Sequence, residues 1–228
     1  MKFTSMVYSA CSGSVGGLTY SRNKYGAYTR IRAMPVNPAS SYQSTVRGFL
    51  AACVATWTTI LTVTQRAEWE TWAMNTPQTG PLGETIIISG QNAFVKMNTF
   101  RMQMGLSVGL SAPIVFANAV LTPTTIISAT ASTDVLSIGF NNADLWATAS
   151  SGRLAVYTGR PQNASKMFFA GPYRLAGFIN GAVTPPTSPL PITAAFPFAV
   201  GQRIHCRFRA MNGDARISTS WRLSIIAV

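Results

Sequence analysis

Residues 201–226 read GQRIHCRFRAMNGDARISTSWRLSII and decide the architecture of the C-terminal half of the chain. Between residues 203 and 209, apolar side chains alternate with basic or imidazole ones, which is the period of a half-buried β-strand. The apolar positions are Ile204, Cys206 and Phe208. The dipeptide Asn212-Gly213 is the strongest short signal for a β-hairpin. The stretch therefore predicts two antiparallel strands with one apolar and one basic face.

The register of this hairpin depends on the length of its turn. A two-residue turn places Arg209 opposite Arg216 and Arg203 opposite Arg222, and like charges in such pairs destabilise a sheet by ~0.2–1 kcal/mol each. A four-residue turn instead places Arg209 opposite Ser218. In both registers the basic face has the same members, because alternate residues keep to one face. They are Arg203, His205, Arg207, Arg209, Arg216 and Arg222.

Two interpretations of the basic face are open. Cations on an edge strand can simply prevent other strands from adding to the sheet. Five arginines on one hairpin face, in a chain with only six acidic residues, exceed what edge protection requires. We therefore expect this face to bind an anionic partner.

The composition points to assembly. Charged residues make up 11% of the 228 residues, against about 25% in an ordinary soluble domain. Neighbouring subunits are thus expected to cover part of the surface, and a homo-oligomer is expected; the alternative is a monomer coated with hydroxyl groups. The net charge is +12, with nine basic and three acidic residues in each half, and 14 of the 18 cations are arginines. Arginine suits fixed contacts to carboxylate or phosphate, so an acidic protein surface, nucleic acid and anionic lipid are the candidate partners.

A second basic segment lies near the N-terminus. Residues 16–33 have strand propensity, and Asn23 and Gly26 bracket a turn, so a β-hairpin is predicted there. The segment before it, GSVGG, reads as a flexible arm, and Pro35 ends the strand that follows. The cations of this hairpin are Arg22, Lys24, Arg30 and Arg32. Tyr20, Tyr25 and Tyr28 lie between them, which would also suit stacking on single-stranded nucleic acid.

Three helices are predicted between residues 41 and 105. Apolar residues recur at three- and four-residue steps over residues 41–61. Thr62 and Gln65 form a capping-box pattern for a second helix. Ser89 is the N-cap candidate of a third helix, which ends at Gly105.

The sequence from Pro113 onward predicts an antiparallel sandwich of about seven strands. Short β-type runs begin near residues 114, 125, 135, 153, 166, 203 and 217, and most are separated by Gly, Pro, Asn or Asp. The Pro-rich residues 184–191 are expected to form a loop. The predicted fold class is α+β, mainly β, with a hairpin and helical domain at residues 1–112 and an immunoglobulin-like β-sandwich at residues 113–228.

No residue pattern predicts catalysis, a metal site or a cofactor. His205 is the only histidine, and the sequence places no carboxylate beside it. The three cysteines are far apart, and Cys53 and Cys206 fall on apolar faces. The N-terminus lacks the apolar segment of a secretory signal. The most apolar run, FLAACVATWTTILTV at residues 49–63, has 15 residues and four threonines, so no membrane span is expected.

Two resemblances accompany these patterns. Residues 113–228 resemble a fibronectin type III or related immunoglobulin-like module, although no diagnostic motif is present. The N-terminal half is similar to small uncharacterised proteins of tailed phages and prophages in four segments. These are GGLTYSRNKYGAYTRIRAMPVNP, the Gln43–Arg47 spacing, LTVTQRAEWETWA and SGQNAFVKMN. That resemblance implies a structural role in a virion and brings no functional residues with it.

We therefore expect a non-enzymatic virion protein, made in the host cytoplasm. Capsid decoration or cement is the first expectation, and another head or tail position is the second. Arginine-rich faces would bind acidic neighbouring subunits. The alternative is a nucleic-acid-binding protein that uses the basic N-terminal hairpin as an arm.

Overall fold

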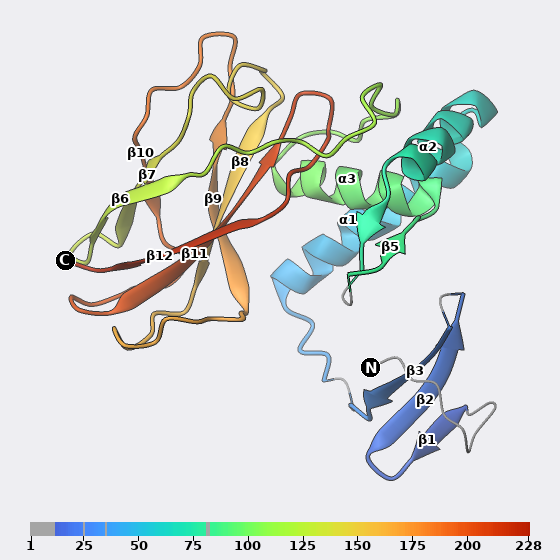
Figure 1. The fold of residues 1–228 in the computed structure, drawn as a ribbon, viewed down its shortest axis with the longest axis horizontal. Helices are drawn as coiled ribbons and strands as arrows, with labels where there is room; N and C mark the ends of the chain where they lie inside the picture. Colours follow the sequence, from blue (N-terminus) through green and yellow to red (C-terminus); the bar gives the residue numbers. More distant parts are fainter. Residues whose placement is uncertain (1–11, 25, 35, 81–82) are drawn as a thin grey trace. The chain divides into compact units, whose positions relative to one another are not determined.

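The computed structural model describes residues 12–24, 26–34, 36–80 and 83–228. The predicted break at Pro35, the role of Tyr25 and the expected lack of a signal segment at residues 1–11 lie outside these residues. The described part contains three helices and twelve strands in four antiparallel sheets, which confirms an α+β, mainly β fold (Figure 1). The chain divides into two compact units, Met1–Gln43 and Ser44–Val228. The helices thus group with the C-terminal strands.

The first unit contains the predicted hairpin and one further strand. β2 (Leu18–Asn23) and β3 (Gly26–Ile31) pair antiparallel, with Asn23 opposite Gly26 at the turn. Gly26 has a φ of +112°, which favours glycine at this position. β1 (Gly13–Val15) pairs with β2, so the expected flexible arm forms an edge strand.

The three predicted helices are confirmed as α1 (Ser41–Thr59), α2 (Val63–Asn75) and α3 (Gly90–Gln103). Thr62 and Gln65 form the capping box before α2, and Ser89 caps α3. A short pair of strands, β4 (Gln78–Thr79) and β5 (Thr85–Ile86), lies between α2 and α3. Among the described residues no single helix is long and apolar enough to cross a membrane. α1 and α2 meet the criteria of length and composition only when they are taken together, and the chain bends by 120° between them.

Seven strands form two sheets. In the first, β6 (Thr125–Thr130), β7 (Val135–Gly139) and β10 (Leu190–Thr193) lie in the order β10-β7-β6. In the second, β8 (Arg153–Gly159), β9 (Tyr173–Asn180), β11 (Arg203–Met211) and β12 (Trp221–Ile226) lie in the order β12-β11-β8-β9. Both sheets contribute to one core, which includes Leu136, Ile138, Val156 and Phe208. This packing is compatible with the predicted sandwich.

Two of the predicted strands are not strands, and two strands were not predicted. Residues 114–121 contribute only an isolated bridge at Ala119, and residues 166–171 form a loop. β9 follows that loop, and β10 begins inside the Pro-rich segment. A strand is possible there because β10 is at the edge of its sheet, where Pro191 need not donate to a neighbour.

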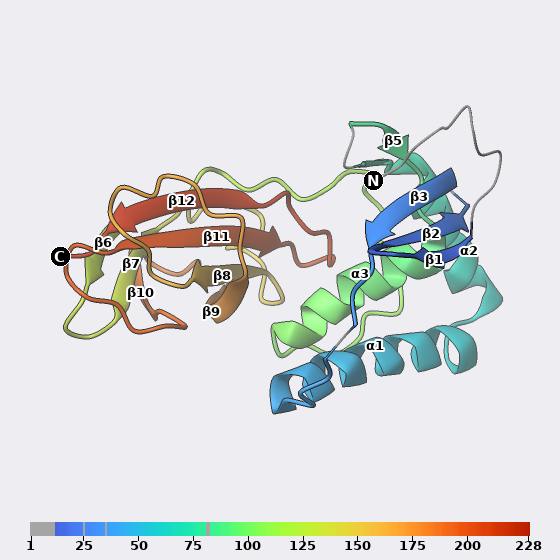
Figure 2. The same ribbon diagram turned by 90° about the horizontal axis from the view of Figure 1, so that it is seen from below.

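A second core joins the helices to the four-stranded sheet. Trp69, Trp72 and Phe94 pack in one cluster with Tyr157 of β8 and Met211 of β11. Figures 1 and 2 show α3 beside the end of the sheet where β8 begins and β11 ends. The outer face of β11 is therefore buried at this end, and only its opposite end remains for a functional surface.

Candidate partner-binding surface

The turn between β11 and β12 is longer than either sequence-based register assumed. Met211 pairs with Ile217 across five intervening residues, and Arg207 lies opposite Arg222. The backbone N–H of Asn212 donates to the Arg216 carbonyl at 3.0 Å. The predicted pairs Arg209–Arg216 and Arg203–Arg222 do not form, and Arg209 is not placed opposite Ser218 as a ladder partner.

Arg216 leaves the basic face because it belongs to this turn. Its Nε donates to the Asp214 carboxylate at 2.6 Å, and Arg216 is only 8% exposed. The predicted basic face is thus reduced to residues of β11 and to Arg222 of β12.

The two ends of the basic face on β11 are engaged within the protein. Arg203 donates to the Ala164 carbonyl at 2.7 Å and to the Ser224 hydroxyl. Arg209 donates to the Ser218 carbonyl at 3.1 Å, and its guanidinium lies over the ring of Phe100 in α3. Neither guanidinium forms part of an open cationic surface.

His205 is buried under the loop that precedes β9. Its ring stacks on Phe169 with centroids 5.4 Å apart, and its Nε2 lies 3.0 Å from the Lys166 carbonyl. A carbonyl only accepts, so Nε2 carries the proton and donates. Burial lowers the pKa of His205, the hydrogen bond to Lys166 raises it, and the charges of Arg203 and Lys166 lower it further. The imidazole is accordingly a neutral packing group.

Arg207 and Arg222 form the centre of the remaining surface. The Arg207 guanidinium lies 4.6 Å from the ring centroid of Tyr157 and 5.2 Å from that of Tyr173, and Arg222 lies 6.0 Å from Tyr173. Neither arginine has a carboxylate partner among the described residues. Burial raises the pKa of Tyr173, while Arg222 and Arg207 lower it. Two cations thus share one aromatic ring with no anion beside them.

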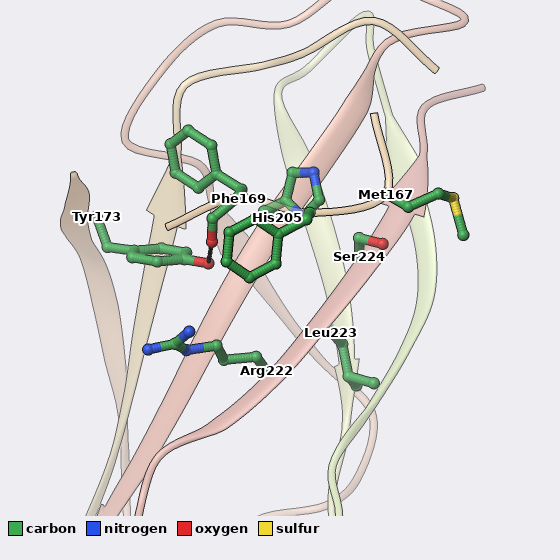
Figure 3. Close-up of a pocket in the computed structure, with 8 residues that line it drawn as sticks. Met167, Phe169, Tyr173, His205, Arg222, Leu223 and Ser224 are labelled. Carbon is green, nitrogen blue, oxygen red and sulfur yellow. Dashed lines mark hydrogen bonds between the residues drawn. The ribbon is translucent and has the colours of Figure 1, made fainter. Parts of the chain in front are cut away.

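A pocket of about 370 Å³ opens next to this pair (Figure 3). Tyr173 donates its hydroxyl proton to the Phe169 carbonyl at 3.0 Å, which fixes the wall of the pocket. Met167 and Phe168 line it and are 74% and 73% exposed. The sequence predicted a strand at residues 166–171, so neither this loop nor the pocket that it lines was expected. The result is a surface with exposed Arg222 beside two exposed apolar side chains.

The cations of the N-terminal sheet do not share one face. Arg22, Lys24, Arg30 and Arg32 are all exposed. The pairing of β2 with β3 places Arg22 on one face and Arg30 on the other. The face with Arg22 also carries a row of paired apolar residues, Val15, Leu18 and Ile31, which are 74%, 41% and 79% exposed. This sheet therefore has an apolar row that no described residue of its own unit covers.

The two described cysteines, Cys53 and Cys206, are buried and unpaired. Burial raises the pKa of the Cys206 thiol to about 12 and raises that of Cys53.

Within the described ranges no three His, Cys, Asp or Glu side chains lie close enough to hold a metal ion. Comparison of the chain with protein-family models, with curated proteins and with solved structures finds no match.

Proposed function

We propose that the protein is a non-enzymatic structural component of a phage virion, in which it binds neighbouring subunits. Capsid decoration or cement is the first position proposed, and another head or tail position is the second. The observation that carries this proposal is the N-terminal sheet, in which no described residue is buried. A sheet of three strands needs a packed apolar face to be stable, so its apolar row is suited to a neighbouring molecule.

The basic surface supports the same proposal. Arg207 and Arg222 have no carboxylate partner among the described residues, and the net charge is +12. Arginine, tyrosine, methionine and phenylalanine are enriched at protein interfaces, and all four occur around this pocket. An acidic surface of a neighbouring virion subunit would compensate the two arginines. The expected homo-oligomer is part of this proposal.

A non-enzymatic role is consistent with the hydrogen bonds that His205, Asp144 and Asp134 form within the protein. The only histidine is buried, and its Nε2 is engaged with a backbone carbonyl. Asp144 accepts hydrogen bonds from Thr122 and Trp146, and Asp134 accepts one from the backbone of Phe198. These two carboxylates hold loops in place, and neither lines the pocket beside β12.

The strand order supports an immunoglobulin-like sandwich of the fibronectin III type. Counted from β6, the first, second and fifth strands form one sheet, and the third, fourth, sixth and seventh form the other. An immunoglobulin constant domain places its fourth strand with the first, second and fifth. Here β9 lies beside β8 instead, which is a variation of the same two-sheet plan.

An inventory of purified particles tests the proposed function. Mass spectrometry of virions from the phage that encodes this chain should find it as a particle component. Leu18→Glu should reduce its incorporation, because the carboxylate would be buried in the apolar contact. Thr19→Glu is the matched control, since it adds the same charge to the opposite face of β2 and should be incorporated normally. Particles without the chain would contradict the proposal.

Nucleic-acid binding by the basic arm is the second candidate function. The exposure of Arg22, Lys24, Arg30 and Arg32 favours it, although the two faces of the sheet divide them. Binding to duplex DNA should weaken with salt at a log–log slope of about −0.9 per phosphate contact. A slope near zero, together with incorporation into particles, would exclude this candidate.

A further inference from the structure

Glu68 is the one described side-chain carboxylate without an interaction partner in this chain. Asp134, Asp144, Glu70 and Asp214 each accept a hydrogen bond, and Glu84 also has a partner. Glu68 lies on α2 and is exposed. In a chain with six acidic residues and 18 basic ones, an uncommitted carboxylate is a rare feature.

Glu68 borders an apolar groove. The groove has a volume of about 660 Å³ and lies between α2 and residues 111–116. Ile114 and Phe116 line it and are 91% and 51% exposed. Exposed apolar groups gathered in a groove are typical of an interaction site. This surface combines a negative charge with apolar side chains.

The pocket beside β12 has the opposite charge and the same kind of apolar groups. There the exposed cation is Arg222, and the exposed apolar side chains are Met167 and Phe168. Figures 1 and 2 show β12 and α2 toward opposite ends of the second unit in both views. One copy of the chain could therefore present the basic surface to the acidic groove of the next copy.

We propose that copies of this chain associate head to tail, with Arg222, Met167 and Phe168 of one copy seated against Glu68, Ile114 and Phe116 of the next. This inference rests on the proposed binding of an acidic protein surface by Arg222, and it names a second copy as that partner. Such a contact joins two different surfaces, so repeated copies form a ring or a filament. The apolar groups supply most of the affinity, and the ion pair selects the orientation.

Charge reversal tests the pairing. Sedimentation of the full-length chain over a concentration series at physiological ionic strength should show self-association, with a mean mass that rises with protein concentration. Arg222→Glu and Glu68→Arg should each weaken it roughly tenfold or more, because each opposes two like charges at the contact. Arg160→Glu is the matched control for Arg222→Glu, since it changes the same charge at an exposed position outside both surfaces and should associate like the wild type.

Mixing the two variants distinguishes a lost contact from a lost fold. An equimolar mixture of Arg222→Glu and Glu68→Arg restores opposite charges at every contact, so it should associate with alternating copies. The double variant carries a reversed pair and should associate by itself. Restoration in the mixture supports the proposed contact, and a mixture that stays dissociated overturns it.

The same measurements separate this inference from the proposed function. A wild-type chain that is monomeric at every concentration overturns the head-to-tail contact. Incorporation into virions is decided independently by the particle inventory. A monomer found in particles would therefore contradict the self-association alone.

Discussion

Arg207 and Arg222 lie directly opposite each other on β11 and β12, and both guanidinium groups lie over the ring of Tyr173. The distances to the ring centroid are 5.2 and 6.0 Å. The aromatic face attracts both cations, but two like charges opposite each other repel. Arg222 is the exposed member, and it is more than half an ångström farther from the ring, so its attraction to Tyr173 is the weaker of the two.

Arg222→Gln should therefore stabilise the monomer. Removing the repulsion should raise the free energy of unfolding by ~0.2–1 kcal/mol. Urea unfolding at low salt measures this gain, and the gain should shrink as salt is added because exposed charges are screened. Arg30→Gln, an exposed change in the first unit, should leave unfolding of the second unit unaffected. A loss of stability in Arg222→Gln would mean that its contact with Tyr173 outweighs the repulsion.

His205 makes stability depend on pH. Its pKa in the folded protein is lowered, chiefly by burial, so the folded state favours the neutral ring. Below the unfolded value of about 6.5, the unfolded chain takes up a proton that the folded protein does not. The free energy of unfolding should thus fall on acidification from this pH, by at most about 1.4 kcal/mol per pH unit.

Urea unfolding between about pH 5 and pH 8 tests the assignment to His205. His205→Phe keeps an aromatic ring against Phe169 but cannot be protonated. It should be less stable overall, because the Lys166 carbonyl loses its donor, by about 0.5–1.5 kcal/mol. Its stability should change little between pH 6.5 and pH 5, and an unchanged slope in the variant would assign the effect to other groups.

The sequence predicted the elements that have strong local signals. Thr62, Gln65 and Ser89 identify helix starts because capping depends on neighbouring residues only. The period-2 alternation of β11 assigns Phe208 to the core and Arg207 to the other face, and the packing agrees. These signals are local, so one sequence is sufficient to find them.

The binding surface depends on contacts that are distant in sequence. The turn of residues 212–216 contains an ion pair between the buried Arg216 and the exposed Asp214, and it is longer than the two-residue turn that Asn212-Gly213 favours. Arg203 donates to the Ala164 carbonyl, and Arg209 lies over the ring of Phe100. Both contacts join residues far apart in the sequence, so no local pattern predicts them. The sequence therefore predicted a basic face on β11, but it wrongly included Arg216 and did not show which cations remain accessible.

Asp214→Asn tests the role of the ion pair in the turn. The substitution removes the charge that compensates Arg216, which is 8% exposed. The free energy of unfolding should fall by about 0.5–1.5 kcal/mol, because water screens the exposed carboxylate of Asp214 and the substituted amide oxygen can still accept a hydrogen bond. Thermal or urea unfolding measures the loss. The double variant Asp214→Asn, Arg216→Gln should regain part of it, and a single variant as stable as the wild type would show that the pair does not hold the turn.

The N-terminal sheet should be protected from hydrogen exchange only when it is covered. No described side chain of β1, β2 or β3 is buried, whereas Ile204, Cys206 and Phe208 of β11 are at most 1% exposed. Exchange of β11 amides thus requires opening of the core, with a free energy near that of global unfolding, while β2 and β3 open at a cost close to zero. Hydrogen exchange with mass spectrometry on the free, full-length chain measures both in one experiment. Binding of the apolar row to a neighbouring subunit would slow exchange in β2 and β3 in assembled particles. Equal protection of β2 and β11 in the free chain would mean that Val15, Leu18 and Ile31 are already covered within one copy, which would remove the reason to assign them to a partner.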